Sequence, residues 1–282
     1  MTATAVGQTD AGPSRLRSVL GQRRILGLLI GRDLKVRYAD STLGYLWSVL
    51  EPLLMAGVYW FVFTKIFPRG SAAENPYIVF LLLGLLPWNW ANAVMTGASK
   101  AIAGEAKLVR SVDVPREIWV LRIVGSKFFE FLFSIPVVVF FMIVLHEGVN
   151  RNIAWVPVAM AMEWVALTGI ALILAPVTVM MTDVDRLVRI VVRMLFYLSP
   201  VLYSKTQILG SPTHPVHVPK AVKEAYTFNP FTAILSLYRC GVYRSEMPSL
   251  DLAIRGSFVS LVLFLVGIWV FRKLEPAVLK EI

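Results

Sequence analysis

The amino-acid sequence predicts an all-α integral membrane protein with six transmembrane helices. Of its 282 residues, 57% are hydrophobic and 16% are charged, whereas a soluble domain has about 45–50% apolar and about 25% charged residues. The apolar residues form uninterrupted blocks of roughly 20 residues, the length that an α-helix needs to cross about 30 Å of hydrocarbon. Because polar and apolar residues do not alternate within these blocks, we expect helices rather than the strands of a barrel.

Six apolar blocks are long enough, or nearly so, to span a bilayer. We place them at residues 45–67, 77–97, 119–145, 155–181, 188–203 and 252–271. The fifth is the shortest and contains Pro200, which lacks a backbone donor and therefore predicts a break in that helix. We divide the chain into a cytoplasmic N-terminal tail with an amphipathic interface helix, residues 1–43, and a six-helix transmembrane domain, residues 44–282.

The distribution of basic residues predicts the orientation in the membrane. The net charge is +10, and most of the 28 Lys and Arg residues lie before the first span, between spans two and three, after span four and at the C-terminus. Positive residues are enriched in cytoplasmic loops, so both termini of a multi-pass protein of the plasma or inner membrane should be cytoplasmic. The charge is then a topology signal, and we expect no nucleic acid as a partner.

The segment before the first span, residues 21–38, mixes apolar and charged side chains. Leu28, Leu29 and Leu34 alternate with cations such as Arg24 and Lys35, and so many charges exclude a transmembrane helix. An interface helix that lies in the headgroup plane, with its cations near anionic lipid, fits this pattern. A plain cytosolic helix is the alternative.

The connection between the second and third spans, residues 99–117, is long and polar. A helix start is predicted by Asp113, Pro115 and Glu117. Asp113 is a residue type that caps helices, Pro115 suits the first turn, and the acidic Glu117 follows it. A further helix over residues 100–111 is predicted before it. Such a structured loop suggests a docking surface for another protein, and a solvated connector is the alternative.

The segment between the fifth and sixth spans, residues 204–251, is the largest non-spanning part on the outer side. Asn229 followed by Pro230 predicts another helix start. The apolar stretch that follows, residues 231–242, is too short to span a bilayer, so we expect re-entrant or interfacial helices here. Such elements occur where the backbone is buried in protein or lines a water-filled path.

Motifs for enzyme chemistry are weak or missing in the sequence. There is no GxxxxGK(S/T) phosphate-binding loop, so ATP hydrolysis would require a separate chain, which would bind the ATP and Mg²⁺. Asp183 and Asp185 form a DxD pair, which in glycosyltransferases holds a metal ion, but a charged helix end or docking loop explains it better. His214 and His217 lack the further ligands of a metal site. We therefore expect no catalytic residue, no metal and no cofactor in this chain.

Ionisable residues inside the expected spans are functional candidates. Glu130 has Lys127 one turn away as a partner on the same helix. Glu163 lies deep in the fourth span and is either a polar group facing a pore or proton path, or a hydrogen-bonded contact between helices.

Aromatic residues near the ends of the spans belong either to the interfacial belt or to a path for sugars, whose C–H faces stack on aromatic rings. The candidates for lining such a channel are Tyr59, Trp60, Phe63, Trp88, Trp90, Tyr197 and Tyr203.

Several motifs, in the same order along the chain, resemble the permease subunit of ABC-type polysaccharide exporters, the Wzm-like family. The matching stretches are residues 32–38, 41–50, 52–53, 84–88, 107–110, 114–117, 199–201, 229–231 and 238–239. The departures are small: Val112-Asp113-Val114 stands where relatives often have an aromatic residue before the proline. The sequence looks closest to exporters of lipid-linked galactan, the precursor of cell-wall arabinogalactan, with O-antigen and teichoic acid exporters as near relatives.

The resemblance implies a homodimer with a channel between the two copies, a separate ATP-binding subunit on the cytoplasmic face, and a lipid-linked polysaccharide as cargo. Docking to the ATP-binding subunit would then use Lys100, Lys107, Arg110, Asp113, Arg116, Glu117, Asp183, Asp185 and Arg186. A gate for the lipid diphosphate would use Arg32, Lys35, Arg37 and Tyr38, whose cations suit phosphate. Membrane lipids would surround the dimer. The rival classes are a proton-coupled secondary transporter and a membrane glycosyltransferase.

Overall fold

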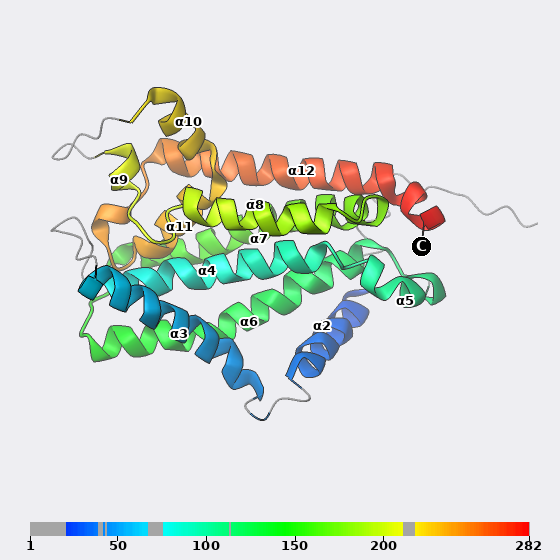
Figure 1. The fold of residues 1–282 in the computed structure, drawn as a ribbon, viewed down its shortest axis with the longest axis horizontal. Helices are drawn as coiled ribbons and strands as arrows, with labels where there is room; N and C mark the ends of the chain where they lie inside the picture. Colours follow the sequence, from blue (N-terminus) through cyan, green and yellow to red (C-terminus); the bar gives the residue numbers. More distant parts are fainter. Residues whose placement is uncertain are drawn as a thin grey trace, which may run out of the picture.

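The computed structural model describes residues 21–38, 42, 44–66, 76–112, 114–210 and 218–281, and these residues form helices joined by turns, without a strand. Figure 1 shows an elongated bundle in which α4, α6, α7, α8 and α12 run along the long axis. The all-α prediction is confirmed for this part of the chain. The N-terminal tail, residues 1–20, lies outside it.

Four helices of the described chain are long and apolar enough to cross a membrane. They are α4 (Tyr77–Ala98), α6 (Glu117–Val144), α7 (Val156–Met180) and α12 (Leu250–Glu281). They correspond to the expected spans two, three, four and six, although α12 continues ten residues past the predicted end at residue 271. The apolar window of α4 is 72% buried, whereas those of α6 and α12 are only 22% buried, so α4 is central and the other two are peripheral.

The helices α7 and α12 pack with their backbones in contact. A Cβ atom added to Gly267 would lie 2.4 Å from the carbonyl oxygen of Gly169, and one added to Gly169 would lie 2.4 Å from the carbonyl of Leu263. Small residues at such crossings let membrane helices approach closely, where van der Waals contact stabilises the pair. This contact holds α7 and α12 together along their length.

The expected first and fifth spans are shorter helices. The first is α3 (Trp47–Phe61), preceded by the 3-10 turn η1 (Gly44–Leu46) and followed by the π-helical turn η2 (Val62–Ile66). The fifth is α8 (Val184–Leu198), which begins four residues before the predicted start. Its 15 residues reach about 22 Å at 1.5 Å per residue. The predicted break is confirmed, because α8 ends two residues before Pro200 and a turn follows.

Short helices lie at both ends of the bundle. The interface segment is α2 (Arg23–Tyr38), which packs on α6. The loop after α4 contains η3 (Ala103–Glu105) and α5 (Ala106–Ser111), so the helix predicted before the third span is present. At the other end lie η4 (Arg151–Trp155), α9 (Thr206–Leu209), α10 (Lys220–Phe228), α11 (Pro230–Arg239) and η5 (Arg244–Glu246).

The predicted start of α11 is confirmed by its cap. The side chain of Asn229 accepts a hydrogen bond from the backbone N–H of Phe231 at 3.0 Å, and Pro230 occupies the first turn. Every residue of α11 after this proline is buried, because the helix packs against α4, α7 and α12. A short helix has thus entered the bundle and is enclosed by protein.

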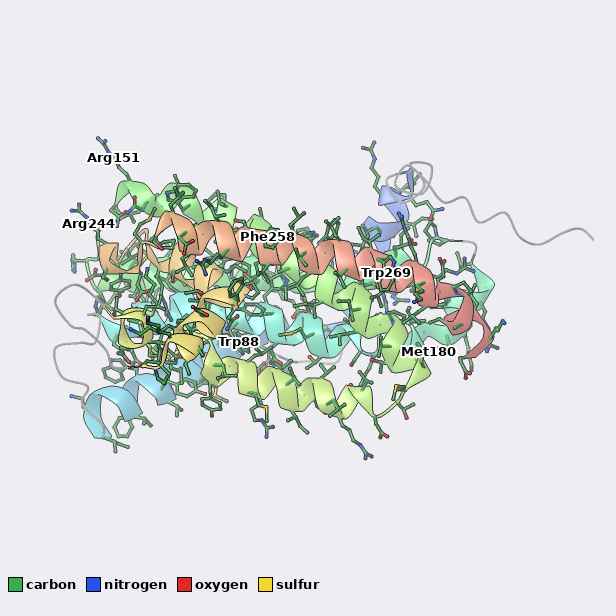
Figure 2. The ribbon with its side chains drawn as sticks, turned by 90° about the horizontal axis from the view of Figure 1, so that it is seen from above. Trp88, Arg151, Met180, Arg244, Phe258 and Trp269 are labelled. Atoms are coloured by element: carbon green, nitrogen blue, oxygen red, sulfur yellow. The ribbon has the colours of Figure 1, made fainter. Side chains whose placement is uncertain are left out.

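The two ends of the bundle are distinct. We call one the α5 end, where α5, the first turn of α8 and the last turn of α12 gather, and the opposite one the α10 end (Figure 1). In Figure 2, Met180 lies toward the α5 end, and Arg151 and Arg244 lie at the α10 end. Phe258 and Trp269 lie along α12 and are exposed, so the long flank of the molecule is apolar.

Candidate functional site

A cluster of four charged residues joins α2 to the loop helix η3 and to α6. Arg122 of α6 is buried, and its Nη1 lies 3.0 Å from Oδ1 of Asp33 and 3.2 Å from Oε1 of Glu105. Arg32 completes the cluster, with Nη2 2.7 Å from Glu105 Oε1 and 3.1 Å from Asp33 Oδ1. We call these four residues the α2 clamp. Two cations alternate with two carboxylates, so each charge has partners of opposite sign.

The environment of Arg32 keeps its guanidinium charged. Burial would lower the pKa of Arg32, but the hydrogen bond to Asp33 and the negative charge of Glu105 outweigh it, and the pKa is raised above its ordinary value. The structure pairs Arg32 with two carboxylates of its own chain, and its expected contact with a lipid diphosphate stays a prediction.

A second contact between α2 and α6 is made by Arg37. Its Nη1 lies 3.2 Å from Oε2 of Glu130, whose Oε1 accepts a hydrogen bond from Lys127 at 2.7 Å. The predicted Lys127–Glu130 pair is therefore confirmed, with Arg37 as a further partner. Of the other expected gate residues, Lys35 is exposed. The side chain of Tyr38 lies outside the described part of the structure.

The residues predicted to dock a partner come from distant segments that meet at the α5 end. The carboxylate of Asp185 accepts a hydrogen bond from Ser99 Oγ at 2.7 Å and one from Arg189 Nη1 at 2.5 Å. Ser99 immediately precedes Lys100, so the loop after α4 is tied to the first turn of α8. Lys100, Asp183 and Arg186 are exposed around this contact.

The remaining docking candidates surround the same end. Lys107 and Arg110 are exposed on α5. Arg116 Nη1 lies 3.9 Å from Oε1 of Glu275, which joins the start of α6 to α12. Glu117 is half-buried in the first turn of α6. Asp113 lies outside the described residues.

The DxD pair has no metal-binding geometry around it. Asp185 is used by Ser99 and Arg189, and Asp183 begins α8 without a side-chain cap bond. Across the described ranges, no group of three or more His, Cys, Asp or Glu side chains could hold a metal ion. His214 and His217 lie outside those ranges. The geometry thus offers no support for a metal-dependent glycosyltransferase.

The aromatic candidates fall into two groups. Trp60 and Tyr197 are exposed, and Tyr59 contacts Phe196 at 6.3 Å between ring centroids, which joins α3 to α8. Tyr203 is half-buried and donates a hydrogen bond to the carbonyl of Tyr197 at 3.1 Å. These residues border the open faces of α3 and α8. The side chain of Phe63 is outside the described structure.

Trp88 and Trp90 differ from this group, because they are 4% and 2% exposed. Trp88 packs edge-on against Phe231 at 5.3 Å, and Trp90 stacks on Phe131 at 5.4 Å. Both indoles are enclosed by rings of their own chain, so neither presents its ring on an outer face of the subunit. Trp90 also lines the polar cavity described below, and the prediction that both indoles line a channel stays a prediction.

A polar cavity of about 480 Å³ lies between the end of α2 and helices α3, α4, α6 and α8. Four cations line it, Arg37, Lys100, Lys127 and Arg189, together with two acids, Glu51 and Glu130. Asn89, Asn92, Thr96 and Ser134 add neutral polar groups, and Trp90 adds an indole. We call it the cationic cavity.

Sequence reasoning missed most of this cavity, although one signal was present. Asn89, Asn92 and Thr96 recur at i, i+3 and i+7, which places them along one stripe of α4, and Lys100 follows in the turn after this helix. Polar residues at this spacing in an otherwise apolar span indicate a surface that faces protein or water rather than lipid.

Arg239 belongs to one of the matching sequence stretches, but its contacts were not predicted from the sequence. It is fully buried, and its guanidinium donates hydrogen bonds to the carbonyls of Phe80, Pro200, Val201 and Tyr203. It also lies over the ring of Phe80, 3.6 Å from the centroid. A Cβ atom on Gly84 would lie 2.1 Å from Arg239 Nη2, so glycine is required there. We call this arrangement the Arg239 anchor; it holds the chain where α8 breaks.

Glu163 is fully buried in α7 and accepts a hydrogen bond from the hydroxyl of Tyr238 at 2.8 Å. Its Oε1 has no hydrogen-bond partner among the described residues. Of the two readings of Glu163, the geometry supports the contact between helices, here α7 and α11. The surrounding protein leaves this side chain no exposed surface.

Comparisons with known proteins agree with these features over almost the whole chain. A family model described as ABC-2 type transporter matches residues 25–243. An O-antigen export system permease of Klebsiella pneumoniae is 30% identical over 258 residues, covering 89% of this chain and 92% of the relative. The corresponding permease of Myxococcus xanthus is 26% identical, covering 88% and 91%. A polysialic acid transport protein of Escherichia coli is 23% identical, covering 92% and 96%.

Proposed function

The chain belongs to the ABC-2 type transporter family, and from this premise we propose that it is the membrane subunit of an ATP-driven exporter of lipid-linked polysaccharide. Full-length relatives are named for O-antigen export and polysialic acid transport, which supports a glycan cargo. The chain carries no phosphate-binding loop, so ATP and Mg²⁺ would be bound by a separate nucleotide-binding subunit.

The observation that carries this proposal is the hydrogen bond between Ser99 and Asp185. It joins the loop after α4 to the first turn of α8. A partner that pushes on α5 can therefore move two helices of the bundle together. Lys107 and Arg110 are exposed on α5 at the same end of the bundle, and exposed cations suit an acidic surface on the partner.

We place the α5 end on the cytoplasmic side, with both termini cytoplasmic in the plasma or inner membrane. Cations are concentrated at this end on α2, on α5 and in the last turns of α12, as the positive-inside rule requires. In this orientation α3 and α8 cross the membrane with the four long helices, which makes six spans, and α11 is a re-entrant helix on the outer side.

A second copy of the chain would complete the transport path. The faces of α3 and α8 that point away from the bundle expose apolar side chains, including Leu54, Val58, Ile190 and Met194. Apolar faces on two short neighbouring helices suit a homodimer in which these helices surround the channel. Tyr59, Trp60 and Tyr197 lie on the same helices and would contact sugars.

The α2 clamp supplies the link between the ATPase and α2. Glu105 lies in the loop helix that precedes α5, and Asp33 and Arg32 lie in α2. A displacement of α5 would therefore reach α2 through three ion pairs. The cargo proposed is lipid-linked galactan, on the resemblance of the sequence motifs; the relatives support polysaccharide export in general.

The experiment is reconstitution of the chain with its co-purifying ATPase in proteoliposomes, followed by ATP-dependent transfer of lipid-linked glycan to the opposite leaflet. We expect the double variant Lys107→Glu and Arg110→Glu to lose transport and ATPase stimulation by glycan. Arg116 is less suitable for charge reversal, because it also pairs with Glu275.

The matched control is Lys220→Glu, which reverses an exposed charge on α10 at the opposite end. It should transport as the wild type does. If the α5 variant transports normally, or if no ATPase is required, the proposed function is wrong.

A further inference from the structure

We propose that Glu246 is a positioning residue for the glycan path: it holds the turn after α8 and, through that turn, the ring of Tyr203. This inference rests on the proposed function and extends it to the α10 end, opposite the docking surface for the ATPase. Tyr203 is one of the aromatic residues predicted to line the channel, and it borders the open face of α8. No sequence motif includes Glu246.

Glu246 belongs to η5, the short turn before α12, and it is fully buried. A buried carboxylate is costly unless it accepts hydrogen bonds. Its Oε1 accepts one from the hydroxyl of Ser204, and its backbone carbonyl accepts one from Nζ of Lys205 at 2.5 Å. Its Oε2 has no hydrogen-bond partner within the described ranges. Among the described residues, the carboxylate of Glu246 therefore depends on Ser204.

The contacts of Glu246 complete a continuous set of hydrogen bonds along the turn after α8. Each residue from 200 to 205 is bonded to α4, α11 or η5. Arg239 of α11 binds the carbonyls of residues 200, 201 and 203, and Tyr77 of α4 donates to that of residue 202 at 2.7 Å. Glu246 holds the next two residues, so the backbone of Tyr203 is held on both sides.

This close hold is confined to the segment that carries Tyr203. The next helix, α9, has no buried residue, so the dense packing ends where the turn ends. The ring of Tyr203 is half-buried, and its hydroxyl donates a hydrogen bond back to the carbonyl of Tyr197 on α8 at 3.1 Å. The ring is thus fixed at its tip by α8 and at its base by the turn. A side chain that is already ordered loses little entropy when it binds a ligand.

Glu246 differs in this respect from the Arg239 anchor. Without the Glu246 carboxylate, Arg239 still binds its carbonyls and the bundle keeps its fold, but the residues after Tyr203 lose a contact that directs the ring. Tyr197, beside it, is 64% exposed, and tyrosine rings combine an apolar face with a polar tip. Such a pair suits a sugar, whose surface has both characters. Glu246 therefore acts on the position of Tyr203 more than on stability.

The test uses the full chain with its ATPase in proteoliposomes and measures ATPase stimulation against the concentration of a synthetic polyprenyl-diphosphate-linked galactan. Glu246→Leu should raise the half-saturating glycan concentration about fivefold, as the loss of one aromatic contact does, and should leave the maximal rate unchanged. Glu246→Gln keeps an oxygen that accepts from Ser204, so it should respond as the wild type does. The matched control is Glu224→Leu, at an exposed acid of α10, which should also respond normally.

A comparison with Tyr203→Leu separates a positioning role from a merely structural one. Because Glu246 acts through Tyr203, Glu246→Leu should add nothing in a chain that already carries Tyr203→Leu, whereas independent effects would multiply. Ser204→Ala removes the same hydrogen bond with a smaller change. It should shift the half-saturating concentration in the same direction, and it carries the test if thermal unfolding shows that Glu246→Leu does not fold.

Wild-type half-saturating concentrations in the folded variants of Glu246 and Ser204 would overturn the inference and leave the exporter intact. Multiplied effects of Glu246→Leu and Tyr203→Leu would do the same. A wild-type complex that the glycan does not stimulate would overturn the proposed function, and this inference with it.

Discussion

Two arginines hold the two ends of the bundle by different means. At the α5 end, Arg122 binds the carboxylates of Asp33 and Glu105, which lie on separate short helices. At the α10 end, Arg239 binds backbone carbonyls of residues 80, 200, 201 and 203. Side-chain partners on short helices can separate and rejoin, whereas buried carbonyls in the turn after α8 need a permanent donor. The comparison predicts a movable α5 end and a rigid α10 end.

The largest effect should come from removing the Arg239 anchor. Arg239→Met leaves four buried carbonyls without their donor, which should lower the free energy of unfolding by about 4 kcal/mol or more. The measurement is thermal unfolding of the detergent-purified protein. Arg244→Met, at an exposed arginine close by, is the matched control. Equal unfolding temperatures for the two variants would contradict a rigid α10 end.

A smaller loss is expected when the space for Arg239 is filled. The Cβ of Gly84→Ala would lie 2.1 Å from Arg239 Nη2 and 2.7 Å from the carbonyl oxygen of Val201. Overpacking of this kind costs about 1–3 kcal/mol, so the unfolding temperature should fall. At Gly57, on α3, a Cβ meets nothing within 4 Å, and Gly57→Ala should be tolerated. If both variants unfold alike, close packing around Arg239 is not what stabilises this end.

The α2 clamp should affect coupling more than stability. Arg122→Gln and Glu105→Gln should each reduce the stimulation of ATPase activity by glycan. In a double-mutant cycle on unfolding, the interaction energy should be about 1–2 kcal/mol. If the single variants retain full stimulation while transport continues, α2 does not respond to α5. Additive effects in the cycle would mean that the ion pair contributes nothing.

The smallest effect is expected for Glu163→Gln. The amide keeps an oxygen that accepts from Tyr238, so stability should change by less than about 1 kcal/mol, and ATP-dependent export should continue. Glu163→Leu, which removes the acceptor, should be less stable than Glu163→Gln in the same thermal assay. Loss of transport in Glu163→Gln without loss of folding would instead favour a proton-coupled transporter.

Local chemistry made several parts of the fold predictable. Three of them depend only on residues within four positions of one another: the Asn229–Pro230 cap, the helix after Pro115 and the Lys127–Glu130 pair. The extra turns of α12 and the earlier start of α8 were harder to predict, because helix ends depend on packing as well as on hydropathy. The buried position of Trp88 likewise depends on Phe231, far along the chain.

The sequence by itself determined the membrane class, the long apolar spans and the break near Pro200, because composition and proline signals are local. Only the tertiary structure decided which charges meet. Asp33, Glu105 and Arg122 come from three elements, and the cationic cavity from five helices. In the sequence, nothing around Arg239 indicates burial; in the structure, α4 and the turn after α8 enclose it. Contacts between distant segments produce no periodic pattern in the sequence, because the packing of the helices determines which residues meet.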